Sequence, residues 1–468
     1  TIDQEKLYGD AVRWYRDVAE PEATPRKLRS LRTTAARAVA RATGTPAGPV
    51  HLNLPFRKPL EPTPVEGDVP ADLPEAAVEG RDGPFVDATT GVPELDDDRL
   101  RDLASSLSAP RGLIVVGPAD APGVDPEAVA ALAHATGFPV LADPLSGVRY
   151  GGVVRTTPVV GGYDGYLGAR VREAWPDPDV VVRTGASPTS KPLRNYLAAV
   201  DADQYVVDPA AGWREAAFTA TDLVVADPTR LFARLSRLLA GPGSDDWRAR
   251  WVDADATHAA ALDDSEAFCE GRILSDVVDL APDPSTLFVS NSMPVRDLDR
   301  FGAPTTTSVT ALGNRGASGI DGIVSTALGA GSATTDHLTL VTGDLAYYHD
   351  MNGLAALERC GVEATVVLLN NDGGGIFHIL PIEAYEPPFT SQFVTPHGLD
   401  FEPTSDLYDL SFARIEGGDR EAFRAAYAEA TAAEGSHVVE VRTDAEASHE
   451  VRDRLRERAV ERVLDATT

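Results

Sequence analysis

The chain has 468 residues, of which 43% are hydrophobic, and a formal net charge of −30. Because one hydrophobic core stops growing at about 250–300 residues, this length predicts two or three packed domains. The acidic charge argues against binding to nucleic acid or to an anionic membrane surface, and no apolar run is long enough to span a bilayer.

The charged residues are unevenly chosen. Acidic residues are spread along the whole chain, whereas lysine occurs only at Lys6, Lys27, Lys58 and Lys191. This pattern is typical of a halophilic protein, in which concentrated salt screens the self-repulsion. The two cysteines are too few for a disulfide framework, so we expect a cytoplasmic protein.

Residues 1–60 resemble the last part of an α/β domain. The sequence predicts a helix over 25–43 and a strand over 49–54. One helix and one strand cannot bury a core on their own, and the chain begins with Thr1 rather than Met. We therefore expect that the beginning of this domain lies outside the sequence. Residues 61–95, rich in Pro, Glu, Asp and Gly, predict a linker.

Residues 96–265 alternate short apolar runs with stretches of helical length. The runs cover 112–116, 139–142, 180–182, 204–207 and 222–225. This alternation predicts a middle α/β domain with a doubly wound parallel sheet. A nucleotide-binding Rossmann domain has the same pattern, but the turn at 117–123 lacks the GxGxxG spacing, so we favour a scaffolding role.

Residues 266–468 predict a third α/β unit with a polar edge. Its strands are expected over 286–290, 338–342, 364–369 and 437–441, with a helix over 349–360. The second strand ends at Gly343-Asp344, and the third ends at a turn that begins Asn370-Asn371. In a parallel crossover both ends lie at the carboxyl edge of the sheet, where ligands of α/β proteins bind.

The polar residues at this edge fit a metal site. Asp344 and Asn371 offer a carboxylate and an amide oxygen, which suit Mg²⁺. A Gly-Asp pair on its own is most often a turn, but Gly-Asp followed by a helix-length gap and Asn-Asn resembles the motif of thiamine-diphosphate (ThDP) enzymes. The resemblance implies that Asp344, Asn371 and the carbonyl of Gly373 hold the metal. Leu345 stands where the superfamily usually has Gly, which points to a subfamily.

Two arginines follow other strand ends of this unit. Arg296 lies in Asn291–Asp297, and Arg315 lies in a glycine-rich stretch before a helix expected over 323–329. Taken singly, Arg296 could pair with a neighbouring aspartate and Arg315 could cap the helix. Beside a Mg²⁺–diphosphate site, the two together favour a pocket for a carboxylate, which an arginine can hold with two parallel hydrogen bonds.

Five segments together resemble one enzyme family. The segments are NSMPVRD (291–297), GNRGASGIDG (313–322), GDLAYYHDMNGLAAL (343–357), NNDGGGIFH (370–378) and GPVHLNLPF (48–56). They are similar to the 2-succinyl-5-enolpyruvyl-6-hydroxy-3-cyclohexene-1-carboxylate synthases of menaquinone biosynthesis, over nearly the whole chain. That family decarboxylates 2-oxoglutarate on ThDP and adds the succinyl carbanion to isochorismate in a 1,4-addition.

The resemblance implies roles for individual residues. Metal ligands would be Asp344, Asn371 and Gly373, binding Mg²⁺ or Mn²⁺. The cofactor would also contact Gly343, Leu345, Gly374, Ile320, Ile376 and Phe377, with Ile320 enforcing its bent shape. Groups facing the substrates would be Ser292, Arg296, Arg315, Asn291 and Lys191.

The resemblance also implies an architecture and an assembly. Three parallel-sheet domains are expected: a remnant of the pyrimidine-binding domain (1–60), the middle domain (96–265) and the diphosphate-binding domain (266–468). In this superfamily the cofactor lies between two subunits, which implies a homodimer or homotetramer. A Glu of the pyrimidine-binding domain activates the cofactor, and no Glu of this chain matches it, so we expect the chain alone to be inactive.

Two alternatives remain open at the level of sequence. One is another ThDP carboligase such as an acetolactate synthase, against which the arginine pair argues. The other is a catalytically dead paralogue that acts as an interaction subunit. The small-molecule substrates and the acidic charge leave no role for nucleic acid or membrane.

Overall fold

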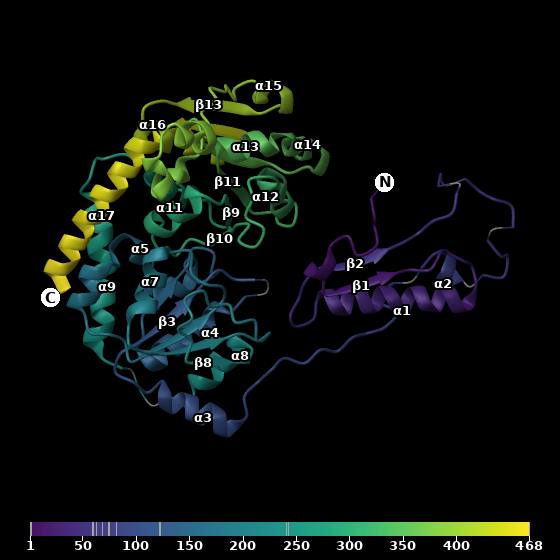
Figure 1. The fold of residues 1–468 in the computed structure, drawn as a ribbon, viewed down its shortest axis with the longest axis horizontal. Helices are drawn as coiled ribbons and strands as arrows, with labels where there is room; N and C mark the ends of the chain where they lie inside the picture. Colours follow the sequence, from purple (N-terminus) through teal and green to yellow (C-terminus); the bar gives the residue numbers. More distant parts are fainter. Residues whose placement is uncertain are drawn as a thin grey trace. The chain divides into compact units, whose positions relative to one another are not determined.

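The computed structural model describes residues 2–58, 60–61, 63–67, 69–73, 75–80, 82–120, 123–239, 241 and 243–467. Four positions of the expected linker, and residues 121–122 of the turn at 117–123, lie outside this description. The chain divides into two compact units, one of residues 1–93 with 209–212 and one of the remaining residues (Figure 1).

The first unit contains two strands rather than one. Strand β1 (Trp14–Asp17) pairs in parallel with β2 (Val50–Asn53), and helix α1 (Pro25–Ala42) connects them. Thr24 caps this helix, because its hydroxyl accepts a hydrogen bond from the Lys27 N–H. The expectation of a single strand is therefore wrong: β1 has four residues without an apolar run. A short helix, α2 (Glu75–Val78), follows.

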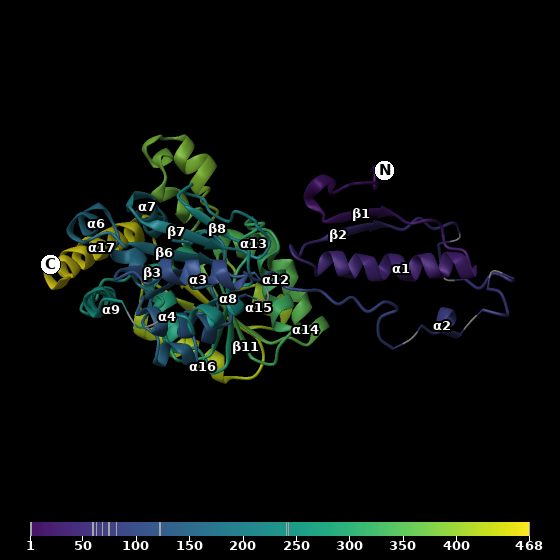
Figure 2. The same ribbon diagram turned by 90° about the horizontal axis from the view of Figure 1, so that it is seen from below.

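The middle sheet has six parallel strands in the order β5-β4-β3-β6-β7-β8. They are β3 (Gly112–Val116), β4 (Val140–Ala142), β5 (Val159–Val160), β6 (Val180–Thr184), β7 (Asp203–Val207) and β8 (Asp222–Val224). Two hydrophobic cores cover its faces, since alternate residues of β3 belong to different clusters. Helices lie on both sides of this sheet (Figure 2). They are α3 (Asp97–Ser106), α4 (Pro126–Thr136), α5 (Tyr163–Tyr166), α6 (Ala169–Ala174), α7 (Lys191–Ala199), α8 (Pro228–Leu235) and α9 (Asp245–Asp263).

The third sheet also has six parallel strands, in the order β10-β9-β11-β12-β14-β13. They are β9 (Ser285–Val289), β10 (Val309–Leu312), β11 (His337–Gly343), β12 (Ala364–Asn370), β13 (Ser411–Ile415) and β14 (His437–Arg442). Its main helices are α10 (Glu270–Asp279), α11 (Met293–Phe301), α12 (Ile323–Gly331), α13 (Asp344–Asp350), α14 (Ala356–Cys360), α15 (Thr404–Tyr408), α16 (Arg420–Ala432) and α17 (Ala445–Thr467). The continuous helix expected over 349–360 is wrong, because α13 begins at Asp344 and a 3₁₀ turn, Met351–Ala355, separates it from α14.

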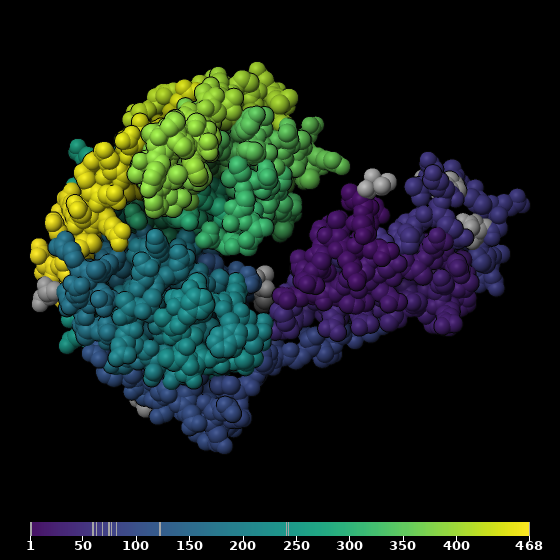
Figure 3. All heavy atoms as spheres, viewed as in Figure 1, coloured from purple at the N-terminus to yellow at the C-terminus, as the bar shows by residue number. Residues whose placement is uncertain are grey.

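The middle and third domains pack against each other within one unit (Figure 3). Arg149 and Asp299 form a fully buried ion pair of 2.9 Å between them, and Arg300 contacts Asp164 at 2.8 Å. Helix α17 crosses from the third domain to lie beside α9, and its Val463 belongs to the middle-domain core. No helix in the described ranges combines the length and the apolar character that a membrane crossing requires.

Candidate active site

A cavity of about 380 Å³ lies at the carboxyl edge of the third sheet. It opens where β9, β11 and β12 end, and these strands are neighbours in the sheet. Thirteen of the fourteen residues expected at the site line it: Asn291, Ser292, Arg296, Arg315, Ile320, Gly343, Asp344, Leu345, Asn371, Gly373, Gly374, Ile376 and Phe377. Since the strands are parallel, one cavity collects residues that lie far apart in sequence.

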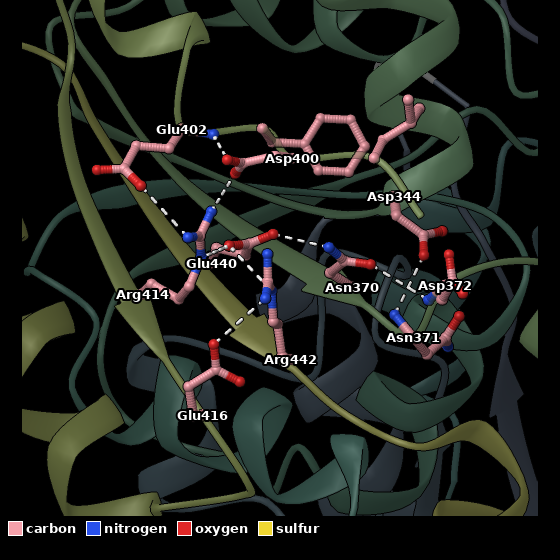
Figure 4. A network of polar contacts seen from close by, with 12 residues as sticks. Asp344, Asn370, Asn371, Asp372, Asp400, Glu402, Arg414, Glu416, Glu440 and Arg442 are labelled. Carbon is pink, nitrogen blue, oxygen red and sulfur yellow. Dashed lines mark hydrogen bonds and ion pairs between the residues drawn. The ribbon is translucent and has the colours of Figure 1, made fainter. Parts of the chain in front are cut away.

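Asp344 sits at the floor of the cavity as the first residue of α13. Its Oδ2 accepts hydrogen bonds from the N–H groups of Asn371 (3.1 Å) and Gly373 (3.0 Å) (Figure 4). Its Oδ1 accepts one from the Leu345 N–H at 2.6 Å. Burial raises the pKa of Asp344 above its usual value, although these N–H donors oppose the shift. The carboxylate therefore ties the ends of β11 and β12 together.

Asn371 presents an unpaired oxygen beside this carboxylate. Its Nδ2 donates to Glu270 Oε1 at 2.8 Å. Its Oδ1 is buried and has no hydrogen-bond partner among the described residues. A buried amide oxygen without a partner costs about 1–3 kcal/mol, so a ligand that accepts its lone pair would be stabilising.

The glycines of the turn are required by close backbone contacts. Gly373 has φ +145°, and a Cβ there would lie 2.1 Å from the Val394 carbonyl oxygen. A Cβ on Gly374 would lie 2.5 Å from the Phe393 carbonyl oxygen. Only glycine fits both positions, because the turn packs directly against the main chain of Phe393 and Val394.

This donor set fits a Mg²⁺–diphosphate group. A carboxylate, an orphaned amide oxygen and a main-chain carbonyl are hard oxygen ligands, and the glycines at 373–375 line the cavity without side chains that would exclude a diphosphate. Within the described ranges, no three His, Cys, Asp or Glu side chains come close enough to hold a metal.

A polar network behind the turn holds it in place. Asn370 donates to Glu440 Oε1 at 2.7 Å and accepts from the Asp372 N–H at 3.2 Å (Figure 4). Glu440 is fully buried on β14 and also accepts from Arg414, which in turn binds Asp400. These contacts join the turn after β12 to the neighbouring strand.

The two arginines face the cavity without carboxylate partners. Arg315 donates to Asn291 Oδ1 at 3.0 Å, and Arg296 donates to the main-chain oxygen of Ser292. In the part of the chain that is described, neither forms an ion pair; Asp297 pairs with Arg452 instead. Burial, and the nearby positive charge of Arg315, lower the pKa of Arg296. Neither arginine is therefore explained by a local ion pair or a helix cap, and two partly buried cations are available to an anion.

Ser292 holds an unusual backbone conformation at the start of α11. Its φ is 69° and its ψ is −132°, which a residue with a Cβ rarely adopts. Such strain costs about 1–3 kcal/mol and persists where the surroundings impose it. The result is that Ser292 and the buried Asn291, whose Nδ2 has no partner, are aimed at the cavity from the end of β9.

Lys191 is the exception among the expected residues. It is exposed at the start of α7 and lines a different cavity, of about 470 Å³, with Arg172 and Arg456. The structure therefore does not bring Lys191 to the Asp344 cavity.

Comparison with known proteins identifies the family. Residues 85–289 match a family model described as the middle domain of thiamine pyrophosphate, another name for ThDP, and 302–441 match the C-terminal TPP binding domain of thiamine pyrophosphate enzymes. A 2-succinyl-5-enolpyruvyl-6-hydroxy-3-cyclohexene-1-carboxylate synthase of Haloquadratum walsbyi is 65% identical over 99% of this chain and 81% of its own length. The chain belongs to this synthase family.

More distantly related proteins support the same family and the same fold. A synthase of the same name from Roseiflexus sp. is 46% identical over 96% of this chain and 77% of its own length. Benzoylformate decarboxylase from Polynucleobacter necessarius has the same fold, with a TM-score of 0.64 at 16% identity, covering 94% of this chain and 77% of that protein. The expected fold class, family and ThDP-dependent enzyme class are confirmed, whereas the domain limits and residue roles remain predictions.

Three residues near the synthase site were missed by the sequence analysis. Glu270 lines the cavity from α10, His397 Nε2 lies 3.3 Å from Asp344 Oδ2, and Arg194 of α7 adds positive charge near Arg296. Burial alone would raise the pKa of Glu270, but Arg452 and hydrogen bonds from Asn371 and Thr443 hold it below its usual value. None of the three lies in a motif that marks a strand end, so no local signal could have found them.

Proposed function

We propose that this enzyme decarboxylates 2-oxoglutarate and adds the remaining four-carbon unit to isochorismate in a 1,4-addition, forming 2-succinyl-5-enolpyruvyl-6-hydroxy-3-cyclohexene-1-carboxylate for menaquinone biosynthesis. The observation that carries the proposal is the pair Arg296 and Arg315 beside the cofactor cavity, which are buried in part and have no carboxylate partner among the residues that the structure describes. Both substrates are dianions, and in a chain of net charge −30 they need a local cationic site.

One group of lining residues would bind the cofactor and its metal, and another group would bind the substrates. Asp344, Asn371 and the Gly373 carbonyl would bind Mg²⁺ or Mn²⁺. Gly343, Leu345 and Gly374 would contact the diphosphate. When bound, ThDP supplies the electron sink for the loss of carbon dioxide.

The remaining lining residues orient the substrates and exclude water. Arg296 and Arg315 would hold carboxylates, while Ser292 Oγ and the unpaired Asn291 Nδ2 would donate to substrate oxygens. Ile320, Ile376 and Phe377 belong to the apolar part of the lining, and the Phe377 ring packs edge-on against Phe393, with 5.2 Å between the ring centroids. An apolar wall favours loss of carbon dioxide, because the charge of the carboxylate disperses as the bond breaks.

The assembly and location follow the family expectation. We propose a cytoplasmic homodimer or homotetramer, because ThDP sites of this superfamily are shared between subunits. Light scattering of the purified enzyme in molar KCl should give two or four copies of the chain, and a monomer that retains activity would contradict the proposal.

The decisive experiment is an assay of the complete gene product with ThDP, Mg²⁺ and molar salt. With 2-oxoglutarate and isochorismate together, one carbon dioxide should be released per product molecule detected by mass spectrometry. Pyruvate is the matched control, since an acetolactate synthase would consume it. Turnover of pyruvate without turnover of 2-oxoglutarate would overturn the proposal in favour of another carboligase.

A further inference from the structure

Glu270 lies behind the proposed metal site, buried at the start of α10 and 2% exposed. Its Oε1 accepts hydrogen bonds from Asn371 Nδ2 and from Thr443 Oγ1, both at 2.8 Å. Its Oε2 accepts from Arg452 Nη2 at 2.6 Å. Three donors therefore converge on one carboxylate.

Arg452 forms a buried ion pair with this carboxylate. The guanidinium is itself 2% exposed and also grips Asp297 through two bonds, Nε to Oδ1 at 2.8 Å and Nη2 to Oδ2 at 2.6 Å. One buried guanidinium thus serves two buried carboxylates, and each of them accepts charged hydrogen bonds from it. Every side-chain hydrogen bond described for Glu270 is therefore one that its carboxylate accepts.

The two ends of the Asn371 amide are nearly the same in shape. Packing alone cannot decide whether the oxygen or the NH₂ group points into the cavity, whereas a hydrogen-bond partner can. Because a carboxylate only accepts, the NH₂ group must face Glu270. Oδ1 then points the other way, where it is buried and has no partner among the described residues, while the main-chain N–H of Asn371 donates to Asp344.

We propose that Glu270 is a positioning residue that sets the orientation of the Asn371 amide, so that Oδ1 rather than NH₂ meets the divalent metal. The inference rests on the metal site of the proposed function and adds a residue to it. Without Glu270, the amide could turn its N–H groups toward the cation, which would repel them.

Glu270→Gln tests the proposal with little change in shape. Arg452, the charged donor, should take the glutamine oxygen, which leaves the glutamine NH₂ facing Asn371. Asn371 must then turn its own oxygen toward residue 270 and its NH₂ toward the metal. In the presence of ThDP, we expect the affinity for Mn²⁺, followed by the electron paramagnetic resonance signal of the free ion, to fall at least about tenfold.

Two further variants separate orientation from general disturbance. Thr443→Val removes another hydrogen bond to the same Glu270 oxygen, and it should leave Mn²⁺ affinity within about threefold of wild type, because Asn371 keeps its acceptor. Asn371→Asp should rescue Glu270→Gln, since a carboxylate offers an oxygen in either orientation. As a single change, Asn371→Asp should bind Mn²⁺ weakly, because two carboxylates would then face each other.

The outcomes distinguish this inference from the metal site itself. If wild type does not bind Mn²⁺ with ThDP, both the metal site and the role of Glu270 are wrong. If wild type binds and folded Glu270→Gln binds equally well, only the role of Glu270 is wrong. If Glu270→Gln does not fold, Asn371→Asp is compared with the double variant that carries both changes. The double variant must then bind Mn²⁺ more tightly than Asn371→Asp alone. An equal or lower Mn²⁺ affinity of the double variant would overturn the proposal.

Discussion

The middle and third sheets have the same number of parallel strands but differ at their carboxyl edges. At the end of β4, both Asp143 oxygens accept main-chain hydrogen bonds, from Leu145 at 2.9 Å and from Thr189 at 2.8 Å. The turn after β3 closes directly on its neighbour, since a Cβ on Gly117 would lie 1.7 Å from the Ala186 oxygen. This edge is filled by its own loops.

The third sheet leaves the corresponding edge open. Asp344 also accepts main-chain N–H groups, but in the lining of the same cavity Asn371 Oδ1 and Asn291 Nδ2 are buried without a partner in the described part of the chain. The comparison shows that a parallel sheet brings strand ends together but does not by itself form a binding site. A binding site arises where polar groups at these strand ends have no partner in the protein and can bind a ligand.

The largest expected effect is the loss of cofactor binding on substitution of Asp344, for which Asp143 of the middle domain is the control. Asp344→Ala should abolish retention of ThDP and Mg²⁺ with the fold intact, because it removes the charged ligand proposed for the metal. Asp143→Ala should leave cofactor binding unchanged but destabilise the fold by about 1–3 kcal/mol for each N–H left unsatisfied. Calorimetric titration and thermal melting measure the two quantities. Unchanged cofactor affinity in Asp344→Ala would refute the metal assignment.

Arginines of the two sheets should also differ, in whether their removal lowers activity or stability. Arg296→Ala and Arg315→Ala should each cost on the order of 2–5 kcal/mol of transition-state stabilisation, from kcat/KM with 2-oxoglutarate. Lysine should rescue poorly, because it cannot make two parallel bonds. The control is Arg183→Ala on β6, where the arginine already pairs with Glu215 at 3.3 Å. It should lower stability and spare kcat/KM; near-wild-type activity of both site variants would make those arginines structural.

A pH experiment probes the junction of the two domains. His258 of α9 is buried, and burial together with the nearby Arg300 of α11 lowers its pKa to about 4. Unfolded histidine has a pKa of about 6.5, so the unfolded chain takes up the proton first and stability is lost as pH falls from 6.5 toward 4. Between pH 7.5 and 5.0 this histidine should account for about 2 kcal/mol of the free energy of unfolding.

The matched variant for this measurement is His258→Gln, which does not titrate there. Urea unfolding in molar KCl should show a smaller fall in stability for the variant than for wild type. If the free energy of unfolding fell equally with pH in the two proteins, the pKa of His258 would be the same in the folded and unfolded states.

The smallest effect is expected for Lys191, which lines a separate cavity. Lys191→Ala should leave kcat unchanged and raise the KM for either substrate by less than about tenfold, since it removes no group from the Asp344 cavity. A loss as large as that of Arg296→Ala would show that the two cavities act as one site during turnover.

Sequence reasoning succeeded where the signal was local. The apolar runs before Asp344 and Asn371 end in polar residues, so both the strands and the edge were predictable from neighbouring positions. Strand β5 has two residues and was missed, because so short a segment shows no periodicity. Glu270 lies 101 positions before Asn371, and which distant carboxylate folds back on an asparagine is decided by tertiary packing alone.

Helix α17 has a consequence for how the chain matures on the ribosome. The Trp175 Nε1–H donates to Thr467 Oγ1 at 2.9 Å, across 292 positions of sequence, and Val463 completes the same core. The middle domain is therefore synthesised long before the helix that closes it. Until α17 emerges, that apolar face has no cover, and Glu270 lacks the guanidinium that neutralises it. The same helix thus completes both the middle-domain core and the ion pair behind the proposed metal site, so both are finished at one late stage of synthesis.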